Sequence, residues 1–246
     1  MDEAIGLSIK SNIATVEQNI QLAQKHRALL TGKTVVPVKL IVVTKNHTTA
    51  EMQQAIDCGL TAVGENRVQE ALAKHDVFQG QLEYHLLGHL QTNKVKQAVP
   101  LFDLIHSVDS EKLAKQINQV AGDLNKIQQV LIEVNVAGEA TKFGVSLSDT
   151  VDFVRCVSEL PHIAVAGLMT IAPHYDDPEE TRSLFHCLYE KFIALKQVCL
   201  PNCTMQWLSM GMTNDYSVAI EEGANMVRVG TAIFGARNYD IELTRR

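Results

Sequence analysis

The chain has 246 residues, of which 46% are hydrophobic and 20% charged, and its formal net charge is −6. This composition is typical of a globular protein. The acidic balance gives no support to binding of nucleic acid or anionic membranes, because both depend on clustered Lys and Arg. No apolar run approaches the roughly 20 residues of a membrane helix. The N-terminus lacks a basic region followed by an apolar core, so no secretory signal is expected.

The five cysteines are odd in number, scattered along the chain, and contain no C-x-x-C pair. Cys199 and Cys203 are four residues apart, but two thiols without further ligands nearby make a poor metal site. We therefore predict no metal at this pair, and reduced cysteines in a cytoplasmic protein.

A long amphipathic helix is predicted first. Over residues 5–31, apolar side chains such as Ile9, Ile13 and Val16 recur at helical spacing, and Gly32 provides a C-terminal stop. Eight short apolar runs read as buried strands, at residues 38–45, 62–64, 84–88, 104–108, 130–136, 165–170, 205–209 and 226–230. Helical segments alternate with them, at residues 48–58, 67–74, 92–99 (before Pro100), 111–124, 148–160, 178–198 and 214–222.

Eight strands that alternate with helices in a chain of this length predict an α/β fold, a single (β/α)8 TIM barrel preceded by the long N-terminal helix. A doubly wound open sheet is the alternative, but the usual glycine fingerprint does not follow the first strand. The sequence contains no linker or low-complexity segment, so we predict one domain over residues 1–246.

Lys45 stands at the end of the first predicted strand. If the pleat is regular, Ile41, Val43 and Lys45 share one face, so the amine lies against buried aliphatic surface. Such a surface disfavours the charged form and makes the amine available as a nucleophile or Schiff-base partner. The alternative is a lysine that extends to solvent where the strand ends.

The loops after the seventh and eighth strands have the composition of a phosphate site. In such barrels the site lies at the carboxyl ends of the strands, and these two loops commonly bind a phosphate. Here they are residues 209–213 and 230–235, and each offers glycine, backbone amides at a helix start and a hydroxyl. One such loop alone is ordinary turn chemistry. The two together predict a phosphate ligand.

Arg228 lies between Val227 and Val229 in what should be a buried strand. Either a carboxylate across the barrel neutralises the guanidinium, or the guanidinium donates to a ligand. Together with Lys45 and the two loops, Arg228 fits pyridoxal 5′-phosphate. The aldehyde would join Lys45, the phosphate would lie on the loops, and the ring nitrogen would face Arg228.

Six segments of the chain form long and specific motifs. They are Val43-Thr44-Lys45, Gly64-Glu65-Asn66-Arg67-Val68-Gln69-Glu70, His85-Leu86-Leu87-Gly88-His89-Leu90-Gln91-Thr92-Asn93-Lys94, Gly167-Leu168-Met169, Ser209-Met210-Gly211-Met212 and Val227-Arg228-Val229-Gly230-Thr231-Ala232-Ile233-Phe234-Gly235. Together they resemble the YggS/PROSC family of pyridoxal phosphate homeostasis proteins, single barrels similar to the N-terminal domain of bacterial alanine racemase. The resemblance runs from about residue 36 to Tyr239.

The resemblance implies that Lys45 forms the internal aldimine with pyridoxal phosphate and that Asn66 lies beside the cofactor. It further implies cofactor contacts from Ser209, Gly211, Met212, Thr213, Arg228, Gly230 and Thr231, with Arg228 at the pyridine nitrogen and the glycines and hydroxyls at the phosphate. The chain departs from the family pattern at Thr213, where serine is common, and at His89, where proline is common.

The implied function is a protein of intracellular vitamin B6 homeostasis that holds pyridoxal phosphate as a Schiff base without efficient catalysis. An arginine at the ring nitrogen disfavours protonation there, so the ring is a weaker electron sink. The alternative is an amino-acid racemase of low activity, which needs an acid or base on each side of the substrate α-carbon. Lys45 could serve one side; alanine racemase takes the other, a tyrosine, from a further domain and a partner subunit. A phosphosugar aldolase is a third interpretation.

Pyridoxal phosphate is the predicted partner, with apo-enzymes that use it as further candidates, and the missing racemase dimer domain favours a monomer. His85 and His89 are four residues apart, but without a third ligand we predict no metal there. Lys94 is interpreted as part of a solvated helix start, with a second phosphate ligand as the minority alternative. Residues 142–144 form either a functional loop or an ordinary turn, and residues 174–177 face solvent or form a lid.

Overall fold

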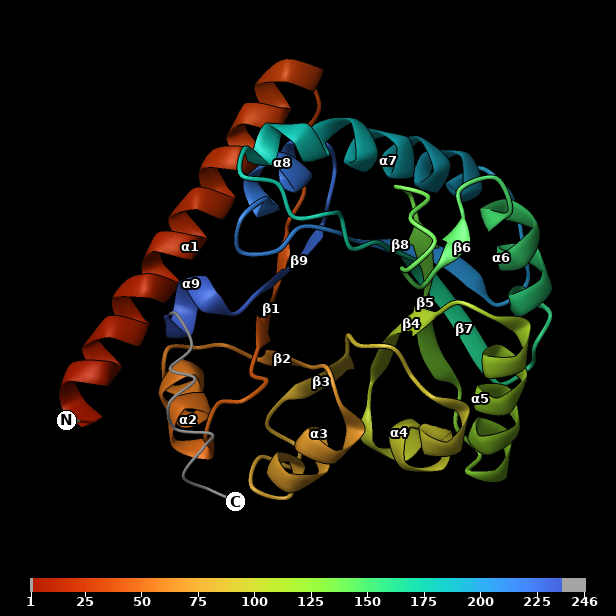
Figure 1. The fold of residues 1–246 in the computed structure, drawn as a ribbon, viewed down its shortest axis with the longest axis horizontal. Helices are drawn as coiled ribbons and strands as arrows, with labels where there is room; N and C mark the ends of the chain where they lie inside the picture. The colour runs from red at the N-terminus through yellow and green to blue at the C-terminus, as the bar shows by residue number, and fades with distance from the viewer. Residues whose placement is uncertain (1, 236–246) are drawn as a thin grey trace.

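The computed structural model describes residues 2–235, with side chains from residue 8 onward, so the end of the resemblance, up to Tyr239, lies outside the described residues. The strands that form the barrel are β1 (Lys39–Val43), β2 (Ala62–Glu65), β3 (Glu83–Leu86), β4 (Leu104–Val108), β5 (Gln128–Asn135), β7 (Ile163–Met169), β8 (Cys203–Ser209) and β9 (Met226–Val229). They are parallel, in the order β4-β3-β2-β1-β9-β8-β7-β5, and the pairing of β4 with β5 closes the ring (Figure 1). The predicted (β/α)8 barrel is confirmed.

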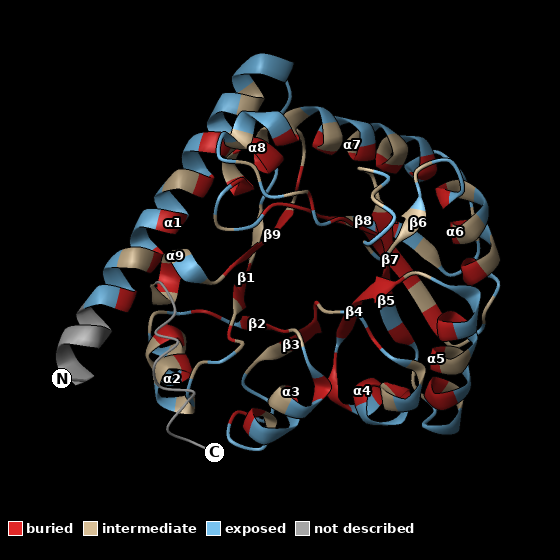
Figure 2. Cartoon of the chain, in the orientation of Figure 1, coloured by how far each residue is buried: buried red, intermediate tan, exposed pale blue. Residues whose placement is uncertain are grey.

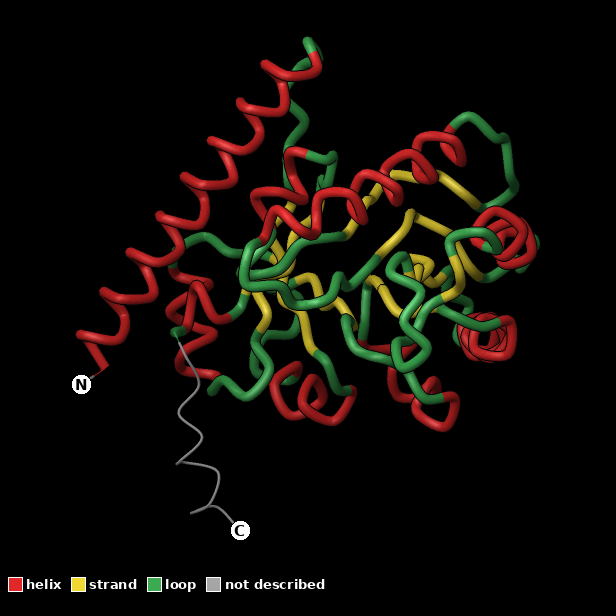
Figure 3. The backbone as a smooth tube through the Cα atoms, turned by 45° about the horizontal axis from the view of Figure 1, so that its top comes forward, coloured by secondary structure: helices red, strands yellow, loops and turns green. Residues whose placement is uncertain are grey.

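Helices surround this ring. They are α1 (Asp2–Thr31), α2 (Thr49–Asp57), α3 (Val68–His75), α4 (Val95–Leu101), α5 (Glu111–Asp123), α6 (Thr150–Ser158), α7 (Arg182–Lys196), α8 (Tyr216–Glu221) and α9 (Thr231–Phe234), with 3₁₀ turns η1 (Thr92–Lys94) and η2 (Pro178–Thr181). Each helix turns an apolar face inward; on α5 that face carries Leu113, Ile117 and Val120. The tube in Figure 3 shows the strands inside, the helices outside and the loops that join them.

The alternation of side chains along the strands separates two buried regions. One residue or two from each of seven strands, or from just beyond a strand end, forms a small interior cluster: Ile41, Ala62, Leu87, Leu104, Leu131, Ala166, Met169 and Met226. Their neighbours, such as Val42, Val63 and Ile105, belong to the large cluster shared with the helices. In Figure 2 the buried residues follow the strands and the inward faces of the helices.

Helix α1 packs beside α8 and α9, the helices that follow β8 and β9 (Figure 1). The amide of Asn12 donates to the carbonyl of Ile233 at 2.9 Å, and the amide of Asn19 donates to the Tyr216 hydroxyl at 3.0 Å. Arg27 donates to the carbonyl of Glu221. The predicted first helix therefore braces the two elements that follow the candidate phosphate loops.

One local prediction needs correction, and one element was not predicted. The helix expected over residues 92–99 is the 3₁₀ turn η1 followed by α4, and it runs past Pro100 to Leu101. Pro100 is tolerated because it lies late in a short helix and removes only one backbone hydrogen bond. The sequence also gave no sign of β6 (Val145–Ser146), a two-residue strand that pairs with β5 outside the ring.

Candidate functional site

A cavity of about 420 Å³ opens where β1, β8 and β9 end, and we call it the Lys45 cavity. It is lined by Val43, Lys45, His47, His174, Met212, Thr213, Asn214, Arg228, Gly230, Thr231 and Gly235. Six of the nine residues predicted to contact the cofactor therefore meet around one cavity: Lys45, Met212, Thr213, Arg228, Gly230 and Thr231.

Lys45 reaches the cavity from a turn, because β1 ends at Val43 and not at residue 45 as predicted. Asn46 has φ +63°, a left-handed conformation that ends the extended backbone. Thr44, the residue before Lys45, is held in place by a buried hydrogen bond. Its hydroxyl donates to Glu65 Oε1 at 2.6 Å. Lys74 Nζ donates to the same oxygen at 2.7 Å and to the Thr44 carbonyl at 2.6 Å. This buried network holds the backbone that carries Lys45.

Arg228 is 3% exposed and stands on β9 with its guanidinium anchored on two sides. Nη1 donates to Ser209 Oγ at 2.7 Å, and Nη2 donates to the Thr170 carbonyl at 2.8 Å. Burial lowers the pKa of Arg228 to about 10, although the carboxyl groups of Asp215 and Glu133 act in the opposite direction. The side chain still lines the cavity, so a fixed cationic donor faces it.

The loop 209–213 is set by packing as much as by its polar groups. Gly211 has φ +92°, and a Cβ there would lie 2.6 Å from Ala219 Cβ, so only glycine fits. The Met212 amide donates to Asp215 Oδ1 at 2.6 Å, and burial raises the pKa of that carboxyl group. Ser209 and Gly211 do not line the cavity: Ser209 accepts a hydrogen bond from Arg228, and Gly211 permits the conformation of the loop.

The second loop lies directly over β1. A Cβ at Gly230 would lie 3.1 Å from the Val43 carbonyl oxygen, so the close approach favours glycine. The two loops also touch, because the Ala232 amide donates to Thr213 Oγ1 at 3.4 Å. Lys45, Thr213 and the start of α9 are thus held on one rim of the barrel.

Asn66 does not line the Lys45 cavity. It follows β2 and lines a neighbouring depression of about 390 Å³ with Arg67, His89 and Lys94. Its carbonyl oxygen lies 2.3 Å from where a Cβ of Gly88 would be, so residue 88 must be glycine.

His85 and His89 do not face each other. His85 is buried and contacts His106 inside the barrel. His89 stacks on the Phe143 ring with 3.8 Å between centroids and faces Asp109 at 3.4 Å. Across the described residues 2–235, no cluster of three or more His, Cys, Asp or Glu could hold a metal ion.

Glu133 on β5 is a further ionisable group of the barrel mouth that the motifs did not identify. Its side chain is almost fully buried, and its Oε2 atom has no hydrogen-bond partner. Burial raises its pKa to about 7, the charge of Asp109 adds to the shift, and Arg228 opposes it. A carboxyl group in the middle of the aliphatic run 130–136 was the available sequence signal.

Sequence reasoning also missed His47 and Asn214 in the cavity lining, and it considered the loop of His174 only as solvent-facing or a lid. The His47 ring stacks on Phe234 at 4.1 Å, so it connects the turn after β1 to α9. Its place two residues after Lys45 was the signal that could have found it.

Known proteins share the sequence and the fold of this chain. The family model described as alanine racemase, N-terminal domain, matches residues 11–238. A pyridoxal phosphate homeostasis protein of Aquifex aeolicus is 44% identical over 202 residues, which are 82% of this chain and 88% of that protein. The chain belongs to the family of pyridoxal phosphate homeostasis proteins. Its relative of the same description in Escherichia coli K12 is 35% identical over 237 residues, 94% of this chain and 97% of that protein.

Solved structures extend the comparison. PipY of Synechococcus elongatus PCC7942, solved with PLP bound, has a TM-score of 0.74 and 37% identity over 87% of this chain and all of that one. An unknown protein from Bifidobacterium adolescentis has a TM-score of 0.87 and 33% identity over 95% of this chain and 97% of that one. Alanine racemase of Clostridium difficile, at 14% identity and a TM-score of 0.66, shows only the shared fold.

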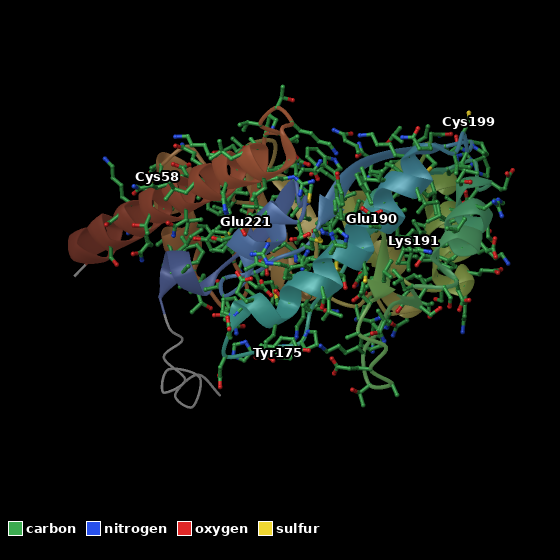
Figure 4. The ribbon with its side chains drawn as sticks, turned by 90° about the horizontal axis from the view of Figure 1, so that it is seen from above. Cys58, Tyr175, Glu190, Lys191, Cys199 and Glu221 are labelled. Carbon is green, nitrogen blue, oxygen red and sulfur yellow. The ribbon has the colours of Figure 1, made fainter. Side chains whose placement is uncertain are left out.

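The cysteines do not contribute to the site as disulfides, because all five are free thiols. Figure 4 places Cys58 and Cys199 at opposite ends of the molecule.

Within the part of the chain that the structure describes, no helix combines the length and apolar character needed to cross a membrane.

Proposed function

We propose that the protein binds pyridoxal 5′-phosphate covalently through Lys45 and holds it for vitamin B6 homeostasis, without efficient catalysis. The observation that carries the proposal is the Lys45 cavity, where a primary amine, a guanidinium and two glycine-containing loops meet. The relatives described as pyridoxal phosphate homeostasis proteins, and PipY with its bound cofactor, support it.

The residues present fit the cofactor. Lys45 supplies the primary amine that would hold the cofactor. When bound, the cofactor would supply an aldehyde for reversible imine chemistry at Nζ, with one water lost on attachment and one consumed on release. Thr213 and Thr231 supply hydroxyls, and the loop backbone around Gly230 supplies close approach, as a phosphate requires. Arg228 supplies a donor that cannot accept a hydrogen bond, and this suits an unprotonated ring nitrogen.

Arg228 also limits catalysis in this proposal. Its guanidinium keeps positive charge beside the ring and disfavours a proton on the ring nitrogen, so carbanion chemistry is poorly supported. Ser209 Oγ and the Thr170 carbonyl accept hydrogen bonds from the guanidinium and hold it in place. We therefore expect binding and release to dominate over racemisation.

The deciding experiment is an absorbance spectrum of the purified protein mixed with pyridoxal phosphate, before and after borohydride. We expect an imine band that borohydride abolishes, with the reduced label on Lys45 by peptide mass analysis. Lys45→Ala should remove both, while Lys191→Ala on the outer helix α7 (Figure 4) should change neither. An imine band that persists in Lys45→Ala would refute the assignment.

Turnover is tested separately by incubation of the loaded protein with L-alanine and other amino acids. Formation of D-amino acid at rates typical of enzymes would favour the racemase alternative. Release of label to an apo-enzyme without racemisation would support a carrier. The proposal also includes a monomeric state and a cytoplasmic location. The five free cysteines support the location, because thiols persist in reducing compartments.

A further inference from the structure

A continuous line of polar side chains crosses the interior of the barrel. Glu83 Oε1 lies 2.8 Å from His85 Nε2, and His85 Nδ1 lies 2.8 Å from His106 Nε2. His106 Nδ1 lies 3.1 Å from Ser209 Oγ, which accepts from Arg228 Nη1 at 2.7 Å. Both histidines and Ser209 are completely buried. We call these five residues the Glu83–Arg228 chain.

The two end residues of the Glu83–Arg228 chain fix the direction of each hydrogen bond. Arginine can only donate, so Ser209 Oγ accepts from it and turns its own proton toward His106 Nδ1. The proton of neutral His106 is then on Nε2 and points to His85 Nδ1. The proton of neutral His85 is likewise on Nε2 and points to the Glu83 carboxylate, which can only accept.

The surroundings keep both rings neutral. Burial lowers the pKa of His85, with Glu83 and Asp103 acting in the opposite direction and Lys39 in the same direction. Burial also holds the pKa of His106 well below its usual range, and the charges of Arg228 and Lys39 add to the effect. Lys39 forms an ion pair with the other oxygen of Glu83, so the carboxylate stays ionised at the far end.

We propose that the Glu83–Arg228 chain is a positioning device for the candidate site, in which His106, acting through Ser209, sets the orientation of the Arg228 guanidinium. Within the Glu83–Arg228 chain, Ser209 Oγ accepts from Nη1 of the guanidinium, and outside it the Thr170 carbonyl accepts from Nη2. These two hydrogen bonds fix Nη1 and Nη2, and so they fix the plane of the guanidinium that faces a ligand. Their acceptors come from the ends of β8 and β7, not from β9 itself. This inference rests on the proposed function, because it assigns Arg228 to the ring nitrogen of pyridoxal phosphate.

The first test reads the protons directly in the cofactor-free protein. Long-range ¹H–¹⁵N spectra of ¹⁵N-histidine-labelled protein at pH 7, assigned with His85→Gln and His106→Asn, should show both rings as neutral Nε2–H tautomers. An Nδ1–H tautomer or a charged ring at residue 85 or 106 would overturn the directed chain. This result does not depend on whether pyridoxal phosphate binds.

The second test reads the site. His106→Phe keeps a flat ring and removes both nitrogens, so loss of one hydrogen bond behind a charged group should weaken pyridoxal phosphate binding about tenfold. It should also shift the absorbance maximum of the bound cofactor. His106→Asn keeps an acceptor for the Ser209 hydroxyl and should recover part of the affinity and of the native spectrum.

Leu131→Ala is the matched control, because Leu131 is a fully buried member of the interior cluster outside the chain. It should lower stability and leave the affinity and the spectrum unchanged. Equal affinity and spectrum in His106→Phe and the native protein, or equal changes in Leu131→Ala, would overturn the proposal. If the Phe variant does not fold, the Asn variant and the tautomer spectra decide. Failure of the native protein to bind the cofactor would instead refute the proposed function.

Discussion

Lys74→Met removes the cation from the buried network beneath the Lys45 turn. Glu65 is completely buried, its Oε1 atom accepts from Thr44 and Lys74, and its Oε2 atom has no partner. Methionine fills most of the volume of the lysine stem but leaves the carboxylate without its counter-charge. The backbone carbonyl of Thr44 also loses its donor.

The expected loss is about 3–5 kcal/mol of unfolding free energy, the range measured when one partner of a buried ion pair is removed. Such a loss is a large share of the ~5–15 kcal/mol typical of a whole protein. In Glu65→Gln/Lys74→Met the buried charge is absent, so the double variant should lose much less than the sum of the single variants.

Urea unfolding followed by circular dichroism measures these differences, provided the slopes agree between variants. Lys115→Met is the matched control, because Lys115 forms an ion pair with Glu111 at the same 2.7 Å distance but on the exposed face of α5. It should scarcely change stability. A loss for Lys74→Met no larger than that for Lys115→Met would refute the reasoning.

Two further substitutions test the barrel itself. The pKa of Glu133 is raised from 4.5 to about 7 on folding, so its ionisation opposes folding at high pH. Glu133→Gln should stabilise the protein by roughly 3 kcal/mol at pH 8, and the gain should fade as the pH falls from 7 toward 4.5; an equal gain in urea unfolding at pH 8 and pH 5 would contradict this. Gly167→Ala should prevent folding, because φ is +154° and a Cβ would lie 1.8 Å from the Trp207 carbonyl oxygen. Soluble yield measures it, with Gly80→Ala as control, since residue 80 has φ +76° but open space around it.

The regular elements could be predicted from the sequence because each barrel strand is a short apolar run bounded by turn residues. The limits of that reasoning appear where tertiary packing decides. β6 pairs only after the loop beyond β5 has folded back, and nothing in Val145–Ser146 itself indicates a strand. The end of β1 is set by the left-handed Asn46 and by the network under Thr44, neither of which periodicity can reveal.

For the candidate site, the motifs predicted which residues lie on the rim of the barrel but not which contact the cavity and which hold other side chains in place. Ser209 was grouped with the phosphate loops, whereas its hydroxyl accepts a hydrogen bond from Arg228. His85 was considered together with His89 because the two are four residues apart, and no metal was predicted there; the pairing of β3 with β4 instead places His85 against His106. Such cross-strand contacts depend on which side chains face the interior at the same height, and a single sequence does not state that register.

Helix α1 has a consequence for how the chain is made. Its buried stripe, including Ile9, Ile13 and Val16, docks on elements some 200 residues later; Asn12 and Ile233 are 221 positions apart. At typical rates of protein synthesis, roughly 10–40 s separate the emergence of these two residues from the ribosome. For most of that interval β1 also lacks its neighbour β9. The nascent chain therefore carries an exposed apolar helix face and an unpaired edge of β1 until β9 has been synthesised, and chaperone dependence during synthesis should be greatest for this segment.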